Sequence, residues 1–449
     1  MKKETARQIA LETLLEIEKF EGYSNRVLNR RLNKSSLEPT DRRLTTKLVY
    51  GILENRNLLD HIIRQYINFR INKLNPAIRN ILRMGIYQIV FMENIPDSAA
   101  VNEAVKLAKE HKKQYSGFVN GVLRNFLRED KAYKLPNREK DLLNHLTVVY
   151  SHPNWIVEKW LKRFGEEFTE ALLKCNNETP PLYARVNTLK TTRDKLVESL
   201  ENEGFSVECG VLSDSLIVKT ENAGSLAHSE AFINGEFTIQ DVAAMAVGHV
   251  VSPKPGQFII DMCAAPGGKT THMATLMEDQ GTVLAWDIYD HKIEKIQENI
   301  DRLGLNSISP ELKDALIKDE NLIEKADVVL IDAPCSGLGI IRRKPEIKFN
   351  KESEDILALS EIQSEMLDVA ADYVKPGGSL VYSTCTIEPE ENEDQVQAFL
   401  NRHPEFLLEK IEEGILPESW SNEKDAYITL YPHIHGTDGF FICKMVKKD

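Results

Sequence analysis

Residues 256–277 read GQFIIDMCAAPGGKTTHMATLM, and this stretch decides the fold. An apolar run ends at Asp261, a glycine-containing turn follows, and a helical pattern begins near Thr270. A strand that leads through such a turn into a helix is typical of the first unit of a doubly wound α/β sheet. The turn brings backbone N–H groups to a ligand, so the stretch predicts a binding loop at the carboxyl end of a strand.

Four further strand-like runs follow this stretch and alternate with amphipathic helical patterns. They are GTVLAWD (281–287), DVVLIDA (327–333), GGSLVYST (377–384) and GFFICKM (439–445). The alternation predicts a parallel α/β sheet with helices on both faces, from about residue 236 onward. Ligands of such sheets bind at the carboxyl ends of the strands, where we therefore expect the functional residues.

Acidic residues stand near the ends of two strands after the binding loop. Asp287 in VLAWD is placed to accept hydrogen bonds from both hydroxyls of a ribose. Asp314 in ELKDALI could read an adenine amino group or could simply cap a helix. The loop also resembles the end of a phosphate-binding G-x-x-x-x-G-K-[ST] loop, but Cys263 stands where that motif needs its first glycine. A nucleotide triphosphatase is therefore disfavoured.

The chain has six cysteines without a C-x-x-C pair, which argues against a zinc site or a disulfide framework. Two of them, Cys335 in APCSG and Cys385 in STCTI, come directly after strand-like runs. Neighbouring strands of a doubly wound sheet bring their carboxyl ends side by side. We therefore expect two thiols in one cleft, and no metal.

Two thiols in one cleft fit the methylation of carbon 5 of a cytosine. This carbon is too weak a nucleophile to attack a methyl sulfonium, but a thiolate that adds at carbon 6 makes it enamine-like. A base must then remove the proton on carbon 5 so that the thiol can be eliminated. A carboxylic acid such as Asp332 could stabilise the activated ring. The reaction chemistry does not determine which of the two cysteines is the nucleophile. The comparison with DNA cytosine methyltransferases, which use a cysteine that follows proline, favours Cys335.

The sequence before the sheet predicts two further domains. Residues 1–130 carry helical patterns throughout and predict an all-α domain, 131–144 read as a linker, and 145–235 predict a small α+β domain that precedes the catalytic domain of 236–449. The chain has a net charge of −13, yet residues 1–130 hold 23 Lys and Arg against 15 Asp and Glu. This basic domain predicts attraction to RNA phosphates.

The amino-terminal stretch starts with lysines but does not read as a secretory leader. Acidic residues interrupt what would have to be its apolar core, namely Glu4, Glu12, Glu16 and Glu18. No stretch of the chain is apolar for long enough to span a bilayer. We therefore expect a cytoplasmic protein.

Several motifs resemble those of the RNA cytosine-5 methyltransferases of the Nop2/Sun group. The matching stretches are DMCAAPGGKTT (261–271), AWD (285–287), DAPCSGLGIIRRKPEIKF (332–349), STCTIEPEEN (383–392), GTDGFFICKM (436–445) and, in the pre-catalytic domain, ARVNTLKT (184–191). The stretches IPDSAAVNEAVKLAKEH (95–111) and FVNGVLRNF (118–126) resemble the helical RNA-binding domain of the antitermination factor N-utilisation substance B. The resemblance covers nearly the whole chain. It implies a Rossmann-like, seven-stranded, mostly parallel domain that uses S-adenosylmethionine to methylate a cytosine of 16S rRNA.

The same resemblance implies a role for each site residue. Cys385 is the nucleophile that forms the covalent adduct, and Cys335 helps to release the methylated product. Asp287, Asp314 and Asp332 belong to the site of S-adenosylmethionine. The loop around this cofactor consists of Cys263, Ala264, Ala265, Pro266, Gly267, Gly268 and Lys269.

Some alternatives stay open at this point. The enzyme could methylate a tRNA cytosine, a uracil or a protein, although paired cysteines argue against a protein substrate. A non-catalytic RNA-binding factor in ribosome assembly would fit the N-terminal resemblance, but the intact DAPCSG and STCT segments argue against it. Four residues are candidates for RNA contacts: Arg185, Asn187, Arg342 and Arg343.

Overall fold

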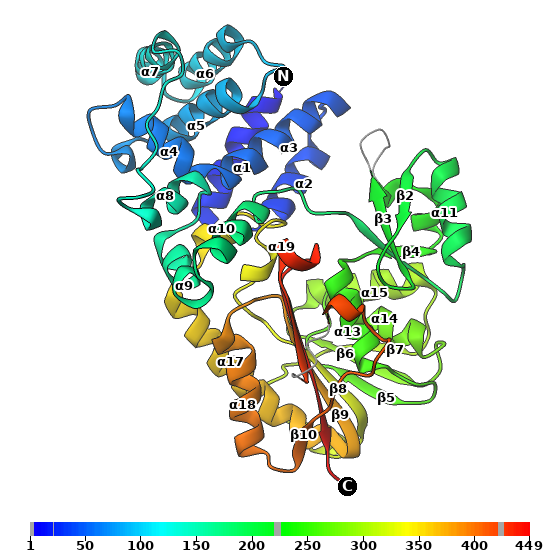
Figure 1. The fold of residues 1–449 in the computed structure, drawn as a ribbon. Coiled ribbons are helices and arrows are strands. Elements are labelled where there is room, and N and C mark those ends of the chain that lie inside the picture. The colour runs from blue at the N-terminus through cyan, green and yellow to red at the C-terminus, as the bar shows by residue number, and fades with distance from the viewer. Residues whose placement is uncertain (1–3, 21, 220–225, 421–425) are drawn as a thin grey trace. The chain divides into compact units, whose positions relative to one another are not determined.

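The computed structural model describes residues 4–20, 22–219, 226–420 and 426–449 (Figure 1). They divide into two units. Unit 1 consists of Met1–Glu178 together with Ile341–Glu352, and unit 2 consists of Thr179–Ile340 together with Ser353–Asp449. Within the described residues, no helix is both long and apolar enough to cross a membrane.

Unit 1 is built from helices that pack around one apolar core. The central helix, α5 (Pro76–Phe91), starts with a proline in its first turn, and the side chain of Asn75 caps it by accepting a hydrogen bond from the N–H of Ala77. Most of its residues are buried, so it packs against neighbours on all sides. The other helices before residue 179 are α1 (Ala6–Phe20), α2 (Ser24–Lys34), α3 (Pro39–Glu54), α4 (Arg56–Gln65), α6 (Asp97–Lys112), α7 (Ser116–Arg128), α8 (Leu142–Val149), α9 (Asn154–Phe164) and α10 (Glu166–Cys175).

A short segment from the second half of the chain completes unit 1. This segment, 341–352, is called the strap below and contains α16 (Ile347–Asn350). The Glu346 carboxylate accepts a hydrogen bond of 2.8 Å from the N–H of Ser24, the first residue of α2. The Lys348 ammonium donates to the carbonyl of Glu54 (3.2 Å) and to the side-chain oxygen of Asn177 (3.0 Å). Burial lowers the pKa of Lys348 to about 7.

Unit 2 begins with a small sheet in which every strand pair is antiparallel. Its strand order is β2-β3-β1-β4. The connections hold helices α11 (Arg193–Asn202) and α12 (Glu230–Ile233). The strands are β1 (Tyr183–Val186), β2 (Ser206–Cys209), β3 (Ser215–Lys219) and β4 (Phe237–Ile239).

The second sheet of unit 2 has eight strands and is parallel in its centre. Its order is β10-β12-β9-β8-β5-β6-β7, and β11 pairs with β12. Strands β5 to β9 pair parallel with one another, whereas β12 pairs antiparallel with β9, β10 and β11. The strands are β5 (Phe258–Asp261), β6 (Thr282–Asp287), β7 (Ile308–Leu312), β8 (Ala326–Asp332), β9 (Val374–Thr384), β10 (Phe406–Leu408), β11 (Tyr427–Leu430) and β12 (Phe440–Lys447).

Helices cover both faces of this sheet, and successive residues of one strand serve the two faces. Ile259 packs in the core formed with α13, α14 and α15, whereas Ile260 packs in the core formed with α17 and α18. Both faces are therefore buried, as a parallel sheet requires. These helices are α13 (Val242–Val251), α14 (Gly268–Leu276), α15 (Asp290–Leu303), α17 (Ser353–Tyr373) and α18 (Glu393–Arg402).

The predicted fold class is confirmed: an all-α part, a small α+β part and a mostly parallel α/β sheet are all present. The sheet has one strand more than the expected seven, because the short β11 adds to β12. The units group the chain differently from the four expected segments. Helices α8, α9 and α10 pack with the N-terminal helices. The strap, which comes from the second half of the chain, belongs to the same unit.

Candidate active site

The carboxyl ends of the parallel strands place three aspartates along one edge of the sheet. Asp261, Asp287 and Asp332 are the last residues of β5, β6 and β8, which lie in the order β8-β5-β6. This edge is where a doubly wound sheet binds its ligands. Asp287 and Asp332, which the sequence predicted as site residues, therefore end strands on either side of the strand that ends at Asp261.

The predicted cofactor loop runs from the end of β5 to the start of α14. The N–H of Ala264 donates to the carbonyl of Trp286 at 2.8 Å, which ties the loop to β6. Gly267 has a φ of +94°, a backbone conformation that favours glycine, and the peptide bond before Pro266 is cis. The Cys263 thiol is buried, and burial raises its pKa, so this cysteine stays a neutral thiol.

Lys269, at the first turn of α14, bridges the cofactor loop and the strand that precedes Cys335. Its ammonium donates to the Asp332 carboxylate at 2.6 Å, and the hydroxyl of Ser383 donates to the other oxygen at 3.0 Å. Burial alone would lower the pKa of Lys269, but the Asp332 carboxylate outweighs burial and raises it. Asp332 is therefore held as a hydrogen-bond acceptor between the loop and β9.

Asp261 is a further residue of this edge that the sequence did not single out as a cofactor ligand. One carboxylate oxygen accepts a hydrogen bond of 2.6 Å from the Thr270 hydroxyl, while the other is buried without a partner among the described residues. Burial raises the pKa of Asp261 to about 7. A buried oxygen without a partner suits a ligand that donates a hydrogen bond, as the ammonium or hydroxyl groups of S-adenosylmethionine do.

Asp287 and Asp314, the two other predicted cofactor ligands, accept different hydrogen bonds. Asp287 accepts hydrogen bonds from the N–H of Tyr289 (3.3 Å) and from Lys292 (3.2 Å), and it is 7% exposed. Asp314 lies just after β7 and accepts from the N–H of Leu316 at 2.9 Å. This contact lies within a turn, and no helix begins at Asp314, so Asp314 is not the helix cap that the sequence allowed. Asp314 still lies near the tip of β6, because the N–H of the preceding Lys313 donates to the carbonyl of Asp287.

The two predicted cysteines meet at the ends of β8 and β9, which are hydrogen-bonded neighbours. Their sulfur atoms lie 3.3 Å apart. The contact with Cys385, together with burial, raises the pKa of Cys335 well above its ordinary value. Cys335 is therefore a neutral thiol that can donate its proton to the sulfur of Cys385.

A buried hydrogen-bond network holds the two cysteine loops in register. The hydroxyls of Ser336 and Thr386, each one residue after a cysteine, are 2.8 Å apart. The Glu391 carboxylate accepts from the N–H of Ser336 (2.8 Å) and from its hydroxyl (2.5 Å). Gln363 of α17 donates to the same carboxylate at 3.1 Å. Burial raises the pKa of Glu391. No local sequence pattern distinguishes this residue from the three other glutamates within residues 388–393.

A close approach of two glycines fixes the loop that carries Cys335. The N–H of Gly339 donates to the carbonyl of Cys385 at 3.0 Å, and the N–H of Gly439 donates to the carbonyl of Gly339 at 2.8 Å. A Cβ on Gly339 would lie 2.0 Å from the Gly439 oxygen and 2.8 Å from the Cys385 oxygen. Only glycine lets these backbones meet, which explains why GLG and TDGFF occur beside the site.

Two of the expected RNA contacts are internal to the fold, and for these the expectation is wrong. Arg185 is 2% exposed, and its guanidinium donates to Gln240, to the carbonyl of Gly268 and to Thr271. Asn187 is also 2% exposed and donates to backbone carbonyls of Gly235 and Leu303. Neither side chain can reach an RNA. Arg342 and Arg343 belong to the strap of unit 1, where Arg342 is buried.

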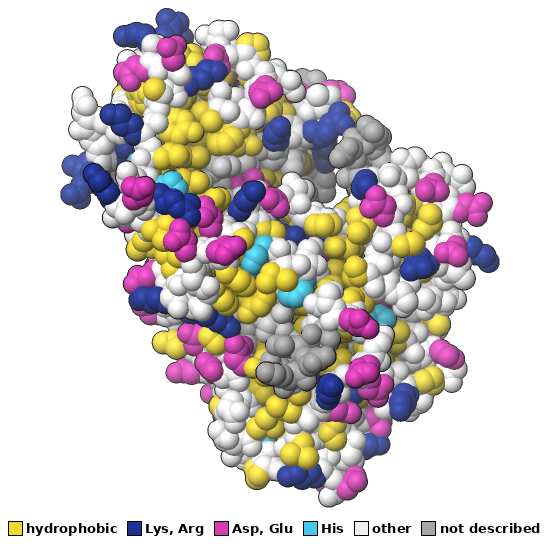
Figure 2. Space-filling view, viewed as in Figure 1, with side chains coloured by type: hydrophobic (Ala, Val, Ile, Leu, Met, Phe, Trp, Pro, Cys, Tyr) yellow, Lys and Arg dark blue, Asp and Glu magenta, His cyan; other side chains and the backbone are white. Residues whose placement is uncertain are grey.

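Unit 1 offers a different basic surface. Figure 2 shows Lys and Arg side chains spread over the visible face of the helices and interspersed with acidic ones. A cavity of about 500 Å³ after α4 is lined by Arg64, Asn68, Phe69, Arg70, Ile71 and Asn72. Arg64, Arg70 and Phe69 are exposed, and neither arginine forms an ion pair with a described residue. Two exposed arginines and an exposed aromatic ring that line one cavity suit a nucleic acid.

Comparison with known proteins identifies the parts of the chain. Residues 4–128 match the NusB family, residues 152–223 match the RsmF/B-like ferredoxin-like domain, and residues 248–446 match the 16S rRNA methyltransferase RsmB/F. The chain is 40% identical, over its full length and that of the relative, to the probable ribosomal RNA small subunit methyltransferase B of Bacillus subtilis. The chain belongs to the ribosomal RNA small subunit methyltransferase B family. Its cofactor is S-adenosylmethionine, as for the family.

Other relatives agree with this assignment. The ribosomal RNA small subunit methyltransferase B of Salmonella typhi is 31% identical over 91% of both chains. The solved structure of PH0851 covers 98% of this chain and 97% of its own, with a TM-score of 0.82 and 30% identity. The structure of NSun6 from Pyrococcus horikoshii with SFG covers 66% of this chain and 98% of its own, with a TM-score of 0.59 and 27% identity.

Proposed function

We propose that the protein transfers a methyl group to carbon 5 of a cytosine in 16S rRNA through a covalent adduct between Cys385 and carbon 6. The observation that carries this proposal is the 3.3 Å separation of the two sulfur atoms at the ends of β8 and β9. A cysteine with a purely structural role needs no second thiol beside it. Two thiols in contact, beside a loop for S-adenosylmethionine, suit a reaction that both forms and breaks a carbon–sulfur bond.

The proposed reaction has three steps. The Cys385 thiolate adds to carbon 6 of the cytosine, and the electron pair of the ring's double bond makes carbon 5 nucleophilic. S-adenosylmethionine supplies the methyl group. A base then takes the carbon 5 proton, the electron pair of the C–H bond restores the ring's double bond, and the Cys385 sulfur leaves carbon 6 as a thiolate. We assign Cys335 to this release, because its thiol is in contact with the sulfur that must leave.

The carboxylates of the site receive distinct roles in this proposal. Asp332, held as an acceptor by Lys269 and Ser383, accepts a hydrogen bond from the 4-amino group of the cytosine. Asp287 binds the ribose of the cofactor, and Asp314 lies on the adenine side. Asp261, with its unpartnered oxygen, binds a donor group of the same cofactor. The loop from Cys263 to Lys269 surrounds it.

We further propose that unit 1 contributes the affinity for RNA. The cavity at Arg64 and Arg70 offers two exposed cations and the exposed ring of Phe69. Contacts with phosphates and stacked bases hold an RNA without reading its sequence. A 16S rRNA substrate places the reaction in the cytoplasm, where the small ribosomal subunit is assembled.

The division of labour between the cysteines is tested with two variants, labelled S-adenosylmethionine and deproteinised 16S rRNA. Cys385→Ala is expected to abolish methylation, because no thiolate activates the ring. Cys335→Ala is expected to accumulate a covalent protein–RNA adduct, seen as a slowly migrating band on a denaturing gel, because release is impaired. Mapping of the label in the wild-type reaction is expected to give 5-methylcytosine.

Each alternative has its own outcome in this experiment. Label in another nucleoside would refute the cytosine assignment, and label in tRNA alone would refute the 16S substrate. An adduct with Cys385→Ala instead of Cys335→Ala would reverse the two roles. Cys443→Ala is the matched control, because this cysteine is buried in β12 and lies in the core with α17 and α18. It should leave the adduct and product patterns unchanged.

A further inference from the structure

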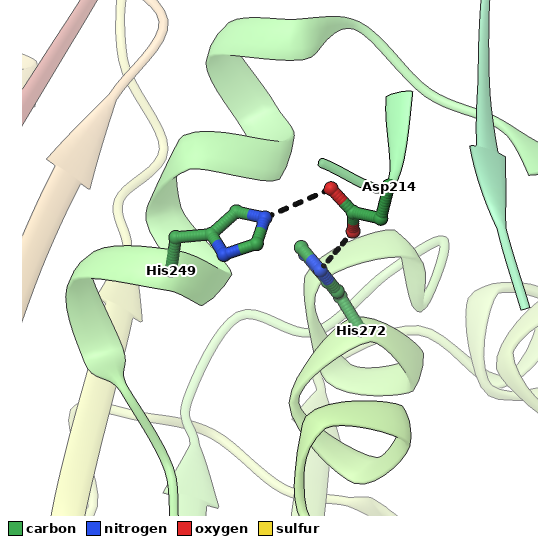
Figure 3. A group of neighbouring side chains, drawn as sticks. All are labelled: Asp214, His249 and His272. Carbon is green, nitrogen blue, oxygen red and sulfur yellow. Dashed lines mark hydrogen bonds and ion pairs between the residues drawn. The ribbon is translucent and has the colours of Figure 1, made fainter. Parts of the chain in front are cut away.

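Three side chains that the sequence analysis did not connect converge inside unit 2 (Figure 3). Asp214 lies in the turn between β2 and β3, His249 lies in α13, and His272 lies in α14. Asp214 thus belongs to the small antiparallel sheet, whereas the two histidines belong to helices that cover the large sheet. We call these three residues the DHH cluster.

The polar atoms of the DHH cluster are within the reach of one ion. Nε2 of His249 lies 2.9 Å from one carboxylate oxygen of Asp214, and Nε2 of His272 lies 2.8 Å from the other. One ligand atom from each residue can be chosen so that all lie within 4.8 Å of one another. Ligands of a zinc ion with bonds of about 2.1 Å lie roughly 3 to 4 Å apart, so shifts below about 1 Å would close the set.

His272 is a buried histidine whose polar contacts are incomplete. It is 1% exposed, and its Nδ1 has no hydrogen-bond partner among the described residues. Its Nε2 lies 2.8 Å from the Asp214 carboxylate. An imidazole nitrogen that is buried without a partner is costly, because its hydration is not replaced.

The backbone of α13 fixes the ring of His272 in this orientation. A Cβ on Gly248 would lie 2.4 Å from Nδ1 of His272, so only glycine at this position admits the ring. Nε2, on the opposite side of the ring, is thereby turned toward Asp214 and His249. The orientation is built into the packing of the two helices.

The Asp214 carboxylate has its close polar contacts with the two imidazoles. The carboxylate side chain is 7% exposed, and no lysine or arginine among the described residues forms an ion pair with it. Arg185 lies in the same region, but its guanidinium donates to Gln240, Thr271 and a backbone carbonyl. A carboxylate buried against two imidazoles is stabilised when a cation lies between them.

We propose that the DHH cluster is a binding site for a divalent transition-metal ion, with Zn²⁺ as the cation that its ligands suit best. Two imidazole nitrogens and one carboxylate are a common zinc donor set, whereas Ca²⁺ and Mg²⁺ prefer oxygen ligands. The sequence predicts no metal site, because its cysteines form no C-x-x-C pair. The proposed site differs from this prediction. Histidines 23 residues apart with a distant aspartate leave no spacing motif in the sequence.

The position of the site gives the ion a structural role. It links the turn of the small sheet to α13 and α14, and α14 starts at the cofactor loop with Gly268. A bound ion would fasten the small sheet to the helix whose first turn carries Lys269 and Thr270. The cluster shares no residue with the pair Cys335 and Cys385, so its metal content can be measured whichever base the enzyme methylates.

The test measures metal content and stability rather than activity. The untagged full-length protein is stripped with a chelator, dialysed against buffered Zn²⁺ and analysed by plasma mass spectrometry. We expect about one Zn²⁺ per chain, and less than about a tenth of that for His272→Ala and for Asp214→Asn. With Co²⁺ the wild type is expected to show visible d–d absorption that His249→Ala lacks. Zn²⁺ should raise the melting temperature of the wild type but not that of His272→Ala or Asp214→Asn.

Two controls separate this site from others on the chain. His291→Ala removes an exposed histidine at the start of α15 and should keep the zinc content of the wild type. The double variant Cys335→Ser, Cys385→Ser removes the thiol pair, a competing zinc site, and should also keep it. Zinc that disappears with the thiols but survives His272→Ala overturns the proposal. A stripped wild type that takes up no metal, and whose melting temperature Zn²⁺ does not change, overturns it as well.

Discussion

Burial changes the chemistry of individual carboxyl groups at this site, and Asp261 shows the effect most clearly. Burial raises its pKa to about 7, against about 3.9 in an unfolded chain. The folded state therefore holds a proton more tightly than the unfolded state. The contribution of this group to the free energy of unfolding is greatest at low pH and is lost as the pH rises from about 4 to about 7. The shift corresponds to an upper bound on the order of 4 kcal/mol.

We expect Asp261→Asn to remove this dependence in the cofactor-free protein. The melting temperature of the wild type should fall more steeply than that of the variant as the pH rises from 5 to 7.5, and the two should differ little in slope above pH 8. Differential scanning fluorimetry across this range measures the effect. Glu298→Gln, which removes an exposed carboxylate of α15, serves as the control and should follow the wild type. Parallel curves for Asp261→Asn and wild type would refute the raised pKa.

Single residues also mark the limit of prediction from the sequence. Cys335, Cys385 and Asp332 could be predicted as neighbours, because each follows a strand and parallel strands end together. Glu391 could not be chosen, because Glu388, Glu390, Glu391 and Glu393 look alike until the fold turns one of them toward Ser336. The prediction that Arg185 contacts RNA is wrong for a related reason. An arginine is usually at the surface, and only the packing of β1 against α14 shows that this one is internal.

At the scale of elements, the two cysteine loops depend on a contact between backbones. Gly339 follows Cys335 by four residues and meets both Gly439 and the carbonyl of Cys385. A methyl group at this contact must push the loops apart, because the atoms it meets are backbone atoms. A methyl group at Gly339 is therefore expected to change the distance between the sulfur atoms of Cys335 and Cys385.

We expect Gly339→Ala to lower the initial rate of methylation at least about tenfold and to destabilise the fold by about 1 to 3 kcal/mol. The rate is measured with labelled S-adenosylmethionine and the stability by thermal melting. Gly117→Ala in α7 is the matched control, because a Cβ there meets no atom within 4 Å. Its rate should equal that of the wild type. A fully active Gly339→Ala would show that the spacing of the loops does not limit the reaction.

The elements themselves were largely predictable, with one instructive exception. The strands of the large sheet have continuous apolar runs bounded by turns, which is a strong local signal. The strap has no such signal: RRKPEIKF is mostly polar, and its buried Glu346 and Lys348 look like surface residues in the sequence. Its place in unit 1 depends on partners some 170 to 320 residues away in the sequence, such as Asn177 and Ser24. No local pattern encodes such contacts.

At the scale of the whole molecule, charge and chemistry are divided between the units. Unit 2 carries the sulfurs and the carboxylates, whereas Arg64, Arg70 and Phe69 of unit 1 line the cavity that we propose as an RNA contact. Contacts to phosphate weaken with added salt, because binding releases counterions. The two functions should therefore be separable by mutation.

We expect the double variant Arg64→Ala, Arg70→Ala to raise the KM for RNA several-fold while kcat stays within about twofold of the wild type. The slope of log affinity against log salt should become shallower by about 1 to 2. Filter binding at several salt concentrations, with steady-state kinetics, measures both. Arg138→Ala is the control, because this exposed arginine of unit 1 is already paired with Glu166 and Glu170. An unchanged salt slope in the double variant would place the RNA elsewhere.

The strap has a consequence for how the protein is made. Residues up to 178 are synthesised before the strap, yet unit 1 is complete only with residues 341–352. The hydrogen bonds of Lys348 and Glu346 to Asn177, Glu54 and Ser24 cannot form until the strap has been translated. Part of the interior of the helical unit therefore stays uncovered while β1 to β8 are synthesised. Chains truncated after residue 178 should therefore be prone to aggregation during synthesis.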